Sequence, residues 1–432
     1  MRLRVSHGIG LALLLTSGAV AWRALSAEPP RAVPPPPAAA APPASGPTLE
    51  ELLRAEGELG EDVAMESPDA LAHFHDALAR AEAGEGQARV LVYGGSHTAG
   101  DLYVGRMREA LQARFGDAGH GFLPLVPWVD NHWAWGMRVD EAEGWGIETV
   151  GFKHRDVARY GLAGAAYETD EAGAFAAVEA DTWGNGRQAS RVEVLYDRQP
   201  GGGALEVWID GRLVETLDTA SDPPEAGRAV YDVSDATHRL EVRAVGDGPV
   251  TVYGAVMERA APGVLVENLG LVGSKARHQL LWDAALWRAL FVTRRPDLVA
   301  LAYGNNETTD THLSIAEHEA HLRAVMTRIT EAAPEASCLL IGPTDRPRVT
   351  EDGELAAREV VGGLTAMQRR VAEAFGCAFF DTLAFQGGLG GGIAWLAHDP
   401  PYMRSDRQHL SREGYLRWGE VLTRALLDGY EP

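Results

Sequence analysis

The chain has 432 residues, of which 39 are basic and 61 acidic, so that its formal net charge is −22. Apolar residues make up 46% of the chain and charged residues 23%. These proportions indicate a globular protein with a large core, more consistent with two domains than with one, and they exclude a disordered chain, a collagen-like fibre and a multi-span membrane protein. The acidic excess, without a block of Lys and Arg, also argues against nucleic acid as a partner.

The N-terminal segment has the pattern of an export signal. Arg2 and Arg4 precede an apolar run over 8–22, and small residues follow at 24–27. This pattern is typical of a secretory signal, so residues 1–27 are predicted to be a signal peptide or, because Arg23 interrupts the cleavage site, an uncleaved anchor that tethers the chain to a membrane. Residues 28–48 are rich in Pro and Ala and are predicted to form a semi-rigid linker. We therefore expect a periplasmic or secreted protein.

Strands and helices alternate through most of the remaining chain. The continuous apolar run Ala88 to Tyr93 is typical of a buried parallel strand, and helical periodicity follows over 104–115. Further strands are predicted over 263–268, 296–303, 338–341 and 377–380, and further helices over 49–83, 276–291, 315–332, 354–375 and 411–427. This alternation predicts an α/β fold, a three-layer sandwich around a mostly parallel five-stranded sheet, formed by residues 49–130 and 262–432.

The segment between these two parts has a different pattern. Short runs of alternating apolar and polar residues, separated by turn residues, predict strands over 190–196, 204–209, 239–245 and 250–257. Residues 131–261 are therefore predicted to form an all-β sandwich module inserted into the α/β domain. Trp residues gather near its start, where they could stack on sugar rings or, the commoner outcome, be buried in the sandwich; they are Trp128, Trp133, Trp135 and Trp145.

Polar residues follow three of the predicted strands, at the edge where active sites of open α/β sheets gather. Ser96 comes after two glycines, in a turn that would expose its hydroxyl; its alternative role is a helix N-cap. Asn306 follows the strand over 296–303, and Asn is also common in ordinary turns. Asp406 lies three residues before His409, a spacing that lets the carboxylate orient the ring, although both could equally lie in a surface loop.

The order of these residues resembles that of the SGNH (GDSL-type) hydrolase superfamily. In that family a nucleophilic Ser, a Gly, an Asn and an Asp-x-x-His motif follow one another, and here Ser96, Gly273, Asn306, Asp406 and His409 take these places. The serine motif departs from the family at position 95, where Gly replaces the usual Asp. The phrases at 96–101, 114–122 and 198–203 are similar to those of peptidoglycan O-acetylesterases that carry an inserted carbohydrate-module-like β-sandwich.

The resemblance implies a serine esterase. Ser96 would be the nucleophile, His409 the base and Asp406 the residue that orients it, while the oxyanion hole would be formed by Ser96, Gly273 and Asn306. No metal or organic cofactor is implied. The expected substrate is an acetylated glycan or peptidoglycan of the cell wall or the extracellular space.

Two other functions remain open from the sequence. The same residues could transfer acetyl groups onto a glycan, and the chain could instead be a catalytically silent glycan-binding protein. The pairing of Cys338 with Cys377 is also open, since export permits a disulfide but buried thiols fit equally well.

Overall fold

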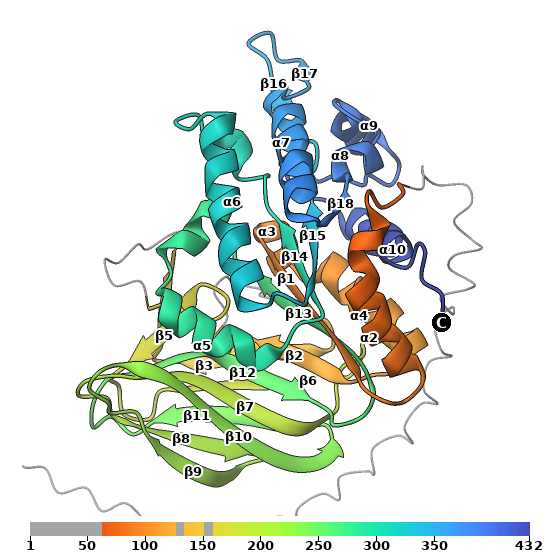
Figure 1. Cartoon of the computed structure of the whole chain (residues 1–432). Coiled ribbons are helices and arrows are strands. Elements are labelled where there is room, and N and C mark those ends of the chain that lie inside the picture. Colours follow the sequence, from red (N-terminus) through yellow and green to blue (C-terminus); the bar gives the residue numbers. More distant parts are fainter. Residues whose placement is uncertain (1–62, 127–133, 151–158) are drawn as a thin grey trace, which may run out of the picture. The chain divides into compact units, whose positions relative to one another are not determined.

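A parallel sheet forms the centre of the computed structural model, which describes residues 63–126, 134–150 and 159–432 (Figure 1). The five strands lie in the order β13-β1-β14-β15-β18 and every neighbouring pair is parallel, which confirms the predicted sheet. Their bounds are β1 Gln87–Gly94, β13 Gly263–Gly270, β14 Leu298–Ala302, β15 Ser337–Ile341 and β18 Ala378–Phe380. The predicted signal (1–27) and linker (28–48) lie outside the described residues, among which no helix is long and apolar enough to cross a membrane.

Helices cover both faces of this sheet (Figure 1). One layer is formed by α2 (Ala72–Glu82), α4 (Leu102–Phe115) and α10 (Arg412–Leu426), and the other by α5 (Ala284–Arg294), α6 (Ile315–Ala332) and α7 (Val360–Phe375). Val90 and Val92 belong to the core under the first layer, whereas Leu91 and Tyr93 belong to the core under the second. Because side chains alternate between the two faces of a strand, a continuous apolar run is what a strand covered on both sides requires.

Two predicted helices differ from those observed. The expected helix over 276–291 is divided into η2 (Ala276–Leu281) and α5, because Asp283 caps a new helix by accepting a hydrogen bond from the Leu286 backbone N–H. The helix expected over 354–375 begins only at Val360, after a small hairpin. The remaining short elements are η1 Pro68–Leu71, α3 Ser96–Ala99, η3 Glu307–Thr309, β16 Arg348–Val349, β17 Leu355–Ala356, α8 Thr382–Phe385 and α9 Gly391–Ala397.

Two antiparallel sheets form the β module between α4 and β13. One has the order β10-β7-β12-β5-β4, and the other β3-β6-β11-β8-β9. Their strands are β3 Met137–Glu143, β4 Gly146–Thr149, β5 Ala165–Thr169, β6 Phe175–Ala180, β7 Ala189–Arg198, β8 Ala204–Ile209, β9 Arg212–Asp218, β10 Glu225–Ala236, β11 Arg239–Ala244 and β12 Val250–Glu258. An antiparallel β module within the α/β chain is thus confirmed.

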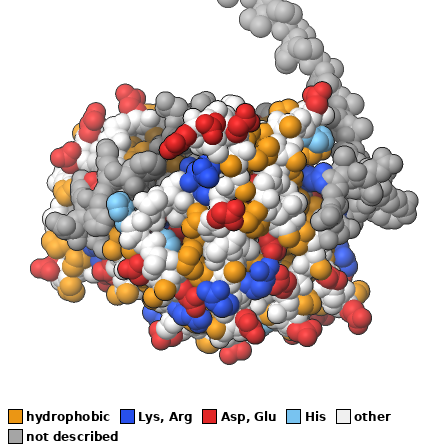
Figure 2. All heavy atoms as spheres, turned by 90° about the horizontal axis from the view of Figure 1, so that it is seen from above, with side chains coloured by type: hydrophobic (Ala, Val, Ile, Leu, Met, Phe, Trp, Pro, Cys, Tyr) orange, Lys and Arg blue, Asp and Glu red, His pale blue; other side chains and the backbone are white. Residues whose placement is uncertain are grey.

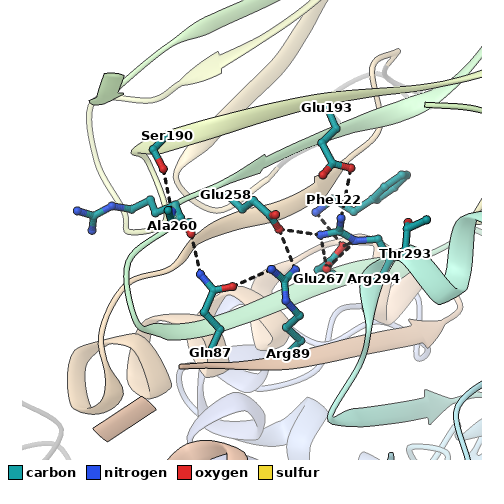
Figure 3. A network of polar contacts seen from close by, with 12 residues as sticks. Gln87, Arg89, Phe122, Ser190, Glu193, Glu258, Ala260, Glu267, Thr293 and Arg294 are labelled. Carbon is teal, nitrogen blue, oxygen red and sulfur yellow. Dashed lines mark hydrogen bonds and ion pairs between the residues drawn. The ribbon is translucent and has the colours of Figure 1, made fainter. Parts of the chain in front are cut away.

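The β module and the parallel sheet share a core. β2 (Gly119–Leu123), which precedes the proposed start of the insert at 131, pairs antiparallel with β12. Figure 3 shows Arg294, at the end of α5, directed at carboxylates from three strands. Its guanidinium contacts Glu267 of β13 at 2.8 Å, Glu258 of β12 at 3.1 Å and Glu193 of β7 at 3.5 Å. Buried ion pairs of this kind fix how the two parts meet.

A disulfide joins the two strands at one edge of the parallel sheet. Cys338, on β15, is bonded to Cys377, the residue before β18. β15 and β18 are hydrogen-bonded neighbours, so the two cysteines lie side by side. The structure therefore selects the disulfide from the two alternatives left open by the sequence.

Candidate active site

Ser96 occupies the turn at the carboxyl end of β1. Gly94 ends the strand and Gly95 is the N-cap of α3, so Ser96 is the first residue of that short helix. A Cβ atom on Gly94 would lie 2.0 Å from the Thr98 hydroxyl oxygen, and one on Gly95 would lie 2.9 Å from the Asn306 amide nitrogen. The two glycines are required by these close approaches. Since Gly95 is the N-cap, the alternative role of Ser96 as an N-cap does not apply.

Ser96, His409 and Asp406 form a continuous chain of hydrogen bonds. Ser96 Oγ lies 2.8 Å from His409 Nε2, and His409 Nδ1 lies 2.9 Å from Asp406 Oδ2. The other carboxylate oxygen, Oδ1, accepts the backbone N–H groups of Gln408 and His409, each at 2.9 Å. Burial, the largest single effect, raises the pKa of Asp406, but the hydrogen bonds from His409 and from the two backbone N–H groups together outweigh it and lower the pKa to about 2. A carboxylate at Nδ1 favours the tautomer whose Nε2 can accept the serine proton.

Asn306 and Gly273 lie on the loops that follow β14 and β13, the two strands on either side of β1. The Asn306 Nδ2 group donates to the Ser274 carbonyl at 2.8 Å and approaches Gly95 on its other side. An amide nitrogen carries two hydrogens, so one remains for an atom bound near Ser96. Gly273 has a φ of 72°, a left-handed conformation that favours glycine. The structure thus places Asn306 between the serine turn and the loop of Gly273 and Ser274.

Glu307, which is not among the predicted site residues, ties these two loops together. Its carboxylate accepts the backbone N–H of Ala276 at 2.9 Å and that of Gly304 at 3.0 Å. Burial raises the pKa of Glu307, and the two backbone N–H donors act in the opposite direction. Its position directly after Asn306 is the only signal in the sequence, and spacing alone does not show that its side chain turns back toward the preceding loop.

His97 lies behind the proposed base. Its ring centre is 5.3 Å from that of His409, and its Nδ1 lies 3.0 Å from the Tyr415 hydroxyl. Burial, with a smaller contribution from His409, lowers the pKa of His97 to about 3. At neutral pH the ring is therefore uncharged, and it packs against the His409 ring without adding a competing positive charge.

Asp101 anchors the end of the serine turn. It is buried at a φ of 51° and pairs with both Nη atoms of Arg108 at 3.2 Å. Its carboxylate also accepts the Trp135 backbone N–H at 2.7 Å and the Asn268 side-chain amide at 2.9 Å. Through Asn268, the turn after Ser96 is fixed to β13, and through Trp135 it is fixed to the start of the β module.

Seen from above the sheet, acidic side chains lie around much of the periphery, and Lys and Arg side chains form smaller separate groups (Figure 2). In the described ranges, no cluster of three or more His, Cys, Asp or Glu side chains is arranged to hold a metal ion. The chemistry available at the carboxyl edge is that of the hydroxyl, the imidazole, the carboxylate and the amide donors around them.

Comparison with known proteins places this geometry in context. Residues 235–417 match the GDSL-like Lipase/Acylhydrolase family. A solved structure described as a peptidoglycan O-acetylesterase in action has a TM-score of 0.70 and 23% sequence identity, covering 84% of this chain and 98% of its own. No curated protein sequence matches at a significant level. The resemblance to SGNH (GDSL-type) hydrolases and the predicted fold are confirmed, and the findings support the expected enzyme class, a serine hydrolase acting on carboxylic ester bonds.

Two further solved structures are similar at a much lower level. A family two carbohydrate esterase from Clostridium thermocellum has a TM-score of 0.27 and 11% identity, covering 62% of this chain and 96% of its own. A Bacillus subtilis protein has a TM-score of 0.32 and 16% identity, covering 70% of this chain and 96% of its own. At these scores the likeness carries no argument about function.

Proposed function

We propose that this serine hydrolase is exported and removes O-acetyl groups from a cell-wall or extracellular glycan. The observation that carries the proposal is the hydrogen-bonded chain from Ser96 through His409 to Asp406 at the carboxyl edge of the sheet. The glycan as substrate is supported by the similarity to a peptidoglycan O-acetylesterase, and export by the N-terminal pattern of charged, apolar and small residues.

In the proposed reaction, Ser96 Oγ attacks the acetyl carbonyl while His409 Nε2 accepts its proton. Asp406 holds the ring and stabilises the imidazolium that forms. The negative charge on the carbonyl oxygen is bound by the backbone N–H groups of Ser96 and Gly273 and by the free Asn306 amide hydrogen. The imidazolium then protonates the sugar oxygen as it leaves, and His409 activates the water that releases acetate from Ser96.

The first test removes the nucleophile. Ser96→Ala should lower kcat for p-nitrophenyl acetate and for an O-acetylated glycan by at least about a thousandfold, because the residues of a triad act as one unit. The fold should be unchanged, since only one hydroxyl is lost. Acetate release and the melting temperature of the protein lacking residues 1–27 provide the measurements.

Ser221→Ala is the matched control, because it removes a hydroxyl that contacts only the Pro223 carbonyl and Glu225 in a turn of the β module. Its activity should equal that of the wild type. Full activity of Ser96→Ala would assign the nucleophile to another residue.

The same assay separates the two remaining functions. A transferase would move the acetyl group to an added glycan acceptor faster than it releases acetate, although it would use the same three residues. A silent glycan-binding protein would hydrolyse neither ester. Either result would overturn the proposed hydrolysis.

A further inference from the structure

Two arginines lie at the same edge of the sheet as Ser96. Arg346 belongs to the loop after β15, and Arg358 lies two residues before α7 begins. Both side chains are half-buried. Neither residue matches a motif in the sequence, and neither is used in the proposed reaction.

Hydrogen bonds hold Arg346 next to the loop that carries Asn306, and a further hydrogen bond holds Arg358 next to Arg346. Arg346 Nη1 donates to the Asn305 carbonyl at 3.3 Å and to the Thr308 hydroxyl at 3.2 Å, on either side of Asn306. Arg358 Nε donates to the Arg346 carbonyl at 3.2 Å. These contacts use one nitrogen of each guanidinium, so the other N–H groups remain available for a ligand.

Within the described residues, no carboxylate lies within 4.0 Å of either guanidinium, although other half-buried or buried arginines such as Arg89, Arg106 and Arg294 are paired. The carboxylates in the vicinity have other partners. Asp345 accepts the backbone N–H groups of Gly390 and Gly392, and Asp406 holds His409.

The two guanidinium groups also affect each other. Burial and then the neighbouring Arg358 lower the pKa of Arg346, whereas Asp406 acts in the opposite direction. Two like charges that are partly withdrawn from water, and that form no ion pair within 4.0 Å among the described residues, are unfavourable in the free protein. An anion bound between them would offset this cost.

We propose that Arg346 and Arg358 bind a carboxylate of the substrate next to the acetyl ester, so that the enzyme selects an acidic glycan over a neutral one. This inference rests on the proposed function and names its substrate class. Guanidinium groups suit a carboxylate because their N–H groups pair with both of its oxygens. The carboxylate can belong to a uronic acid or to the lactyl group of a muramic acid, and the substrates tested separate these sources.

The test compares kcat/KM of the wild type and Arg346→Gln on four esters: p-nitrophenyl acetate, neutral acetylated xylan, acetylated polygalacturonate and O-acetylated peptidoglycan strands freed of stem peptides, so that their lactyl carboxylates are exposed. Charged hydrogen bonds of this kind predict that the variant loses roughly 10- to 100-fold more activity on a carboxylate-bearing glycan than on the two neutral esters. The acidic glycan that shows this loss identifies the source of the carboxylate. Arg346→Lys, which keeps the charge, should recover part of the lost preference.

Arg288→Gln is the control, because Arg288 lies on α5, is exposed and, among the described residues, donates to the Glu331 carbonyl alone. It should leave all four activities unchanged. An equal loss on all four esters in Arg346→Gln would show that the arginine only supports the Asn306 loop, and an unchanged preference would show that it binds nothing; both results overturn the inference.

Binding keeps this test separate from the proposed function. Titration of Ser96→Ala with deacetylated acidic oligosaccharides should give heat that is lost in Ser96→Ala/Arg346→Gln and weakened by added salt. Binding without any ester hydrolysis by the wild type would refute the esterase and retain the carboxylate site. Ester hydrolysis without such binding would refute the carboxylate site and retain the esterase.

Discussion

Position 95 has no room for a side chain because the Asn306 amide occupies the space that a Cβ would need. The Asn306 nitrogen would lie 2.9 Å from that Cβ, and it is itself held by the Ser274 carbonyl. The absence of the usual Asp at this position therefore has a local physical reason in this chain. The serine turn and the amide donor are packed against each other.

Gly95→Ala should lower kcat more than it raises KM. The added methyl group displaces the Asn306 amide from the carbonyl oxygen, and loss of one such donor costs about 2.7–4 kcal/mol of transition-state stabilisation. We expect kcat for p-nitrophenyl acetate to fall by roughly 100- to 1,000-fold. Gly362→Ala is the control, since its Cβ would meet only the flexible Leu389 side chain at 3.3 Å. An active Gly95→Ala would show that Asn306 does not bind the oxyanion.

Two buried histidines make the fold sensitive to acid. Burial lowers the pKa of both His97 and His120 from 6.5 to about 3. The unfolded chain therefore binds more protons than the folded chain between these values, so the free energy of unfolding falls as pH falls from about 6.5 toward 3. Within this window, each histidine lowers the free energy of unfolding by about 1.4 kcal/mol for every unit by which the pH falls. Above a pH of about 6.5 it causes no further change.

Urea unfolding of the wild type and His120→Gln at pH 7, 6, 5 and 4 measures this contribution. The free energy of unfolding of the variant should depend less steeply on pH, by the equivalent of about one proton. The curves of the wild type and the variant should therefore converge as the pH falls. His312→Gln is the control, because His312 is exposed. Parallel curves for wild type and His120→Gln would show that His120 is already charged in the folded protein.

The candidate site could be predicted because its residues lie in motifs at the ends of strands. Ser96, Asn306, Asp406 and His409 all follow strands or precede the last helix, and such positions can be read from apolar runs and turn residues. Glu307 and Arg346 could not be identified in the same way. Their roles depend on where loops from different strands approach each other, and sequence spacing does not contain that information.

At the level of whole elements, the buried strands were the most predictable part. Runs such as 90–93 and 338–341 are apolar throughout because helices cover both faces of the sheet. The β module was harder: the strands β3, β4, β5, β6, β9 and β10 were not predicted, since exposed edges and small residues weaken the alternation. The Cys338–Cys377 bond needed the strand order, because only adjacent strands bring the two residues together.

On the scale of the whole described body, the β module and the hydrolase part are joined too closely for a simple deletion. Removing the module would take two of the three carboxylates, Glu193 and Glu258, away from Arg294 and leave it with Glu267. Breaking a buried ion pair by removing one partner costs about 3–5 kcal/mol. A loss of activity would then report unfolding and not recognition of a glycan. The role of the module must therefore be tested with substitutions at its surface.

Trp183 is the aromatic side chain best placed for that test. It is 38% exposed and packs edge-on against Trp135, with ring centres 5.3 Å apart. Trp135 is buried, as expected for most of these residues, and its backbone N–H is bonded to Asp101 at the end of the serine turn. Trp128 and Trp133 lie outside the described residues. An exposed indole anchored at this junction offers a surface on which a sugar ring of a polymer can stack.

Trp183→Ala should lower kcat/KM on an acetylated polymer by roughly 2- to 12-fold more than on p-nitrophenyl acetate, the range that about 0.5–1.5 kcal/mol of aromatic stacking corresponds to. The small ester cannot reach both the indole and Ser96, so it reports only the catalytic residues. Trp208→Ala is the matched control, because Trp208 lies on β8 and its ring is covered by the Arg243 guanidinium, 5.2 Å from the ring centre. Equal losses on both esters, accompanied by a lower melting temperature, would mean that Trp183 supports the fold and that the module does not hold the polymer through this residue.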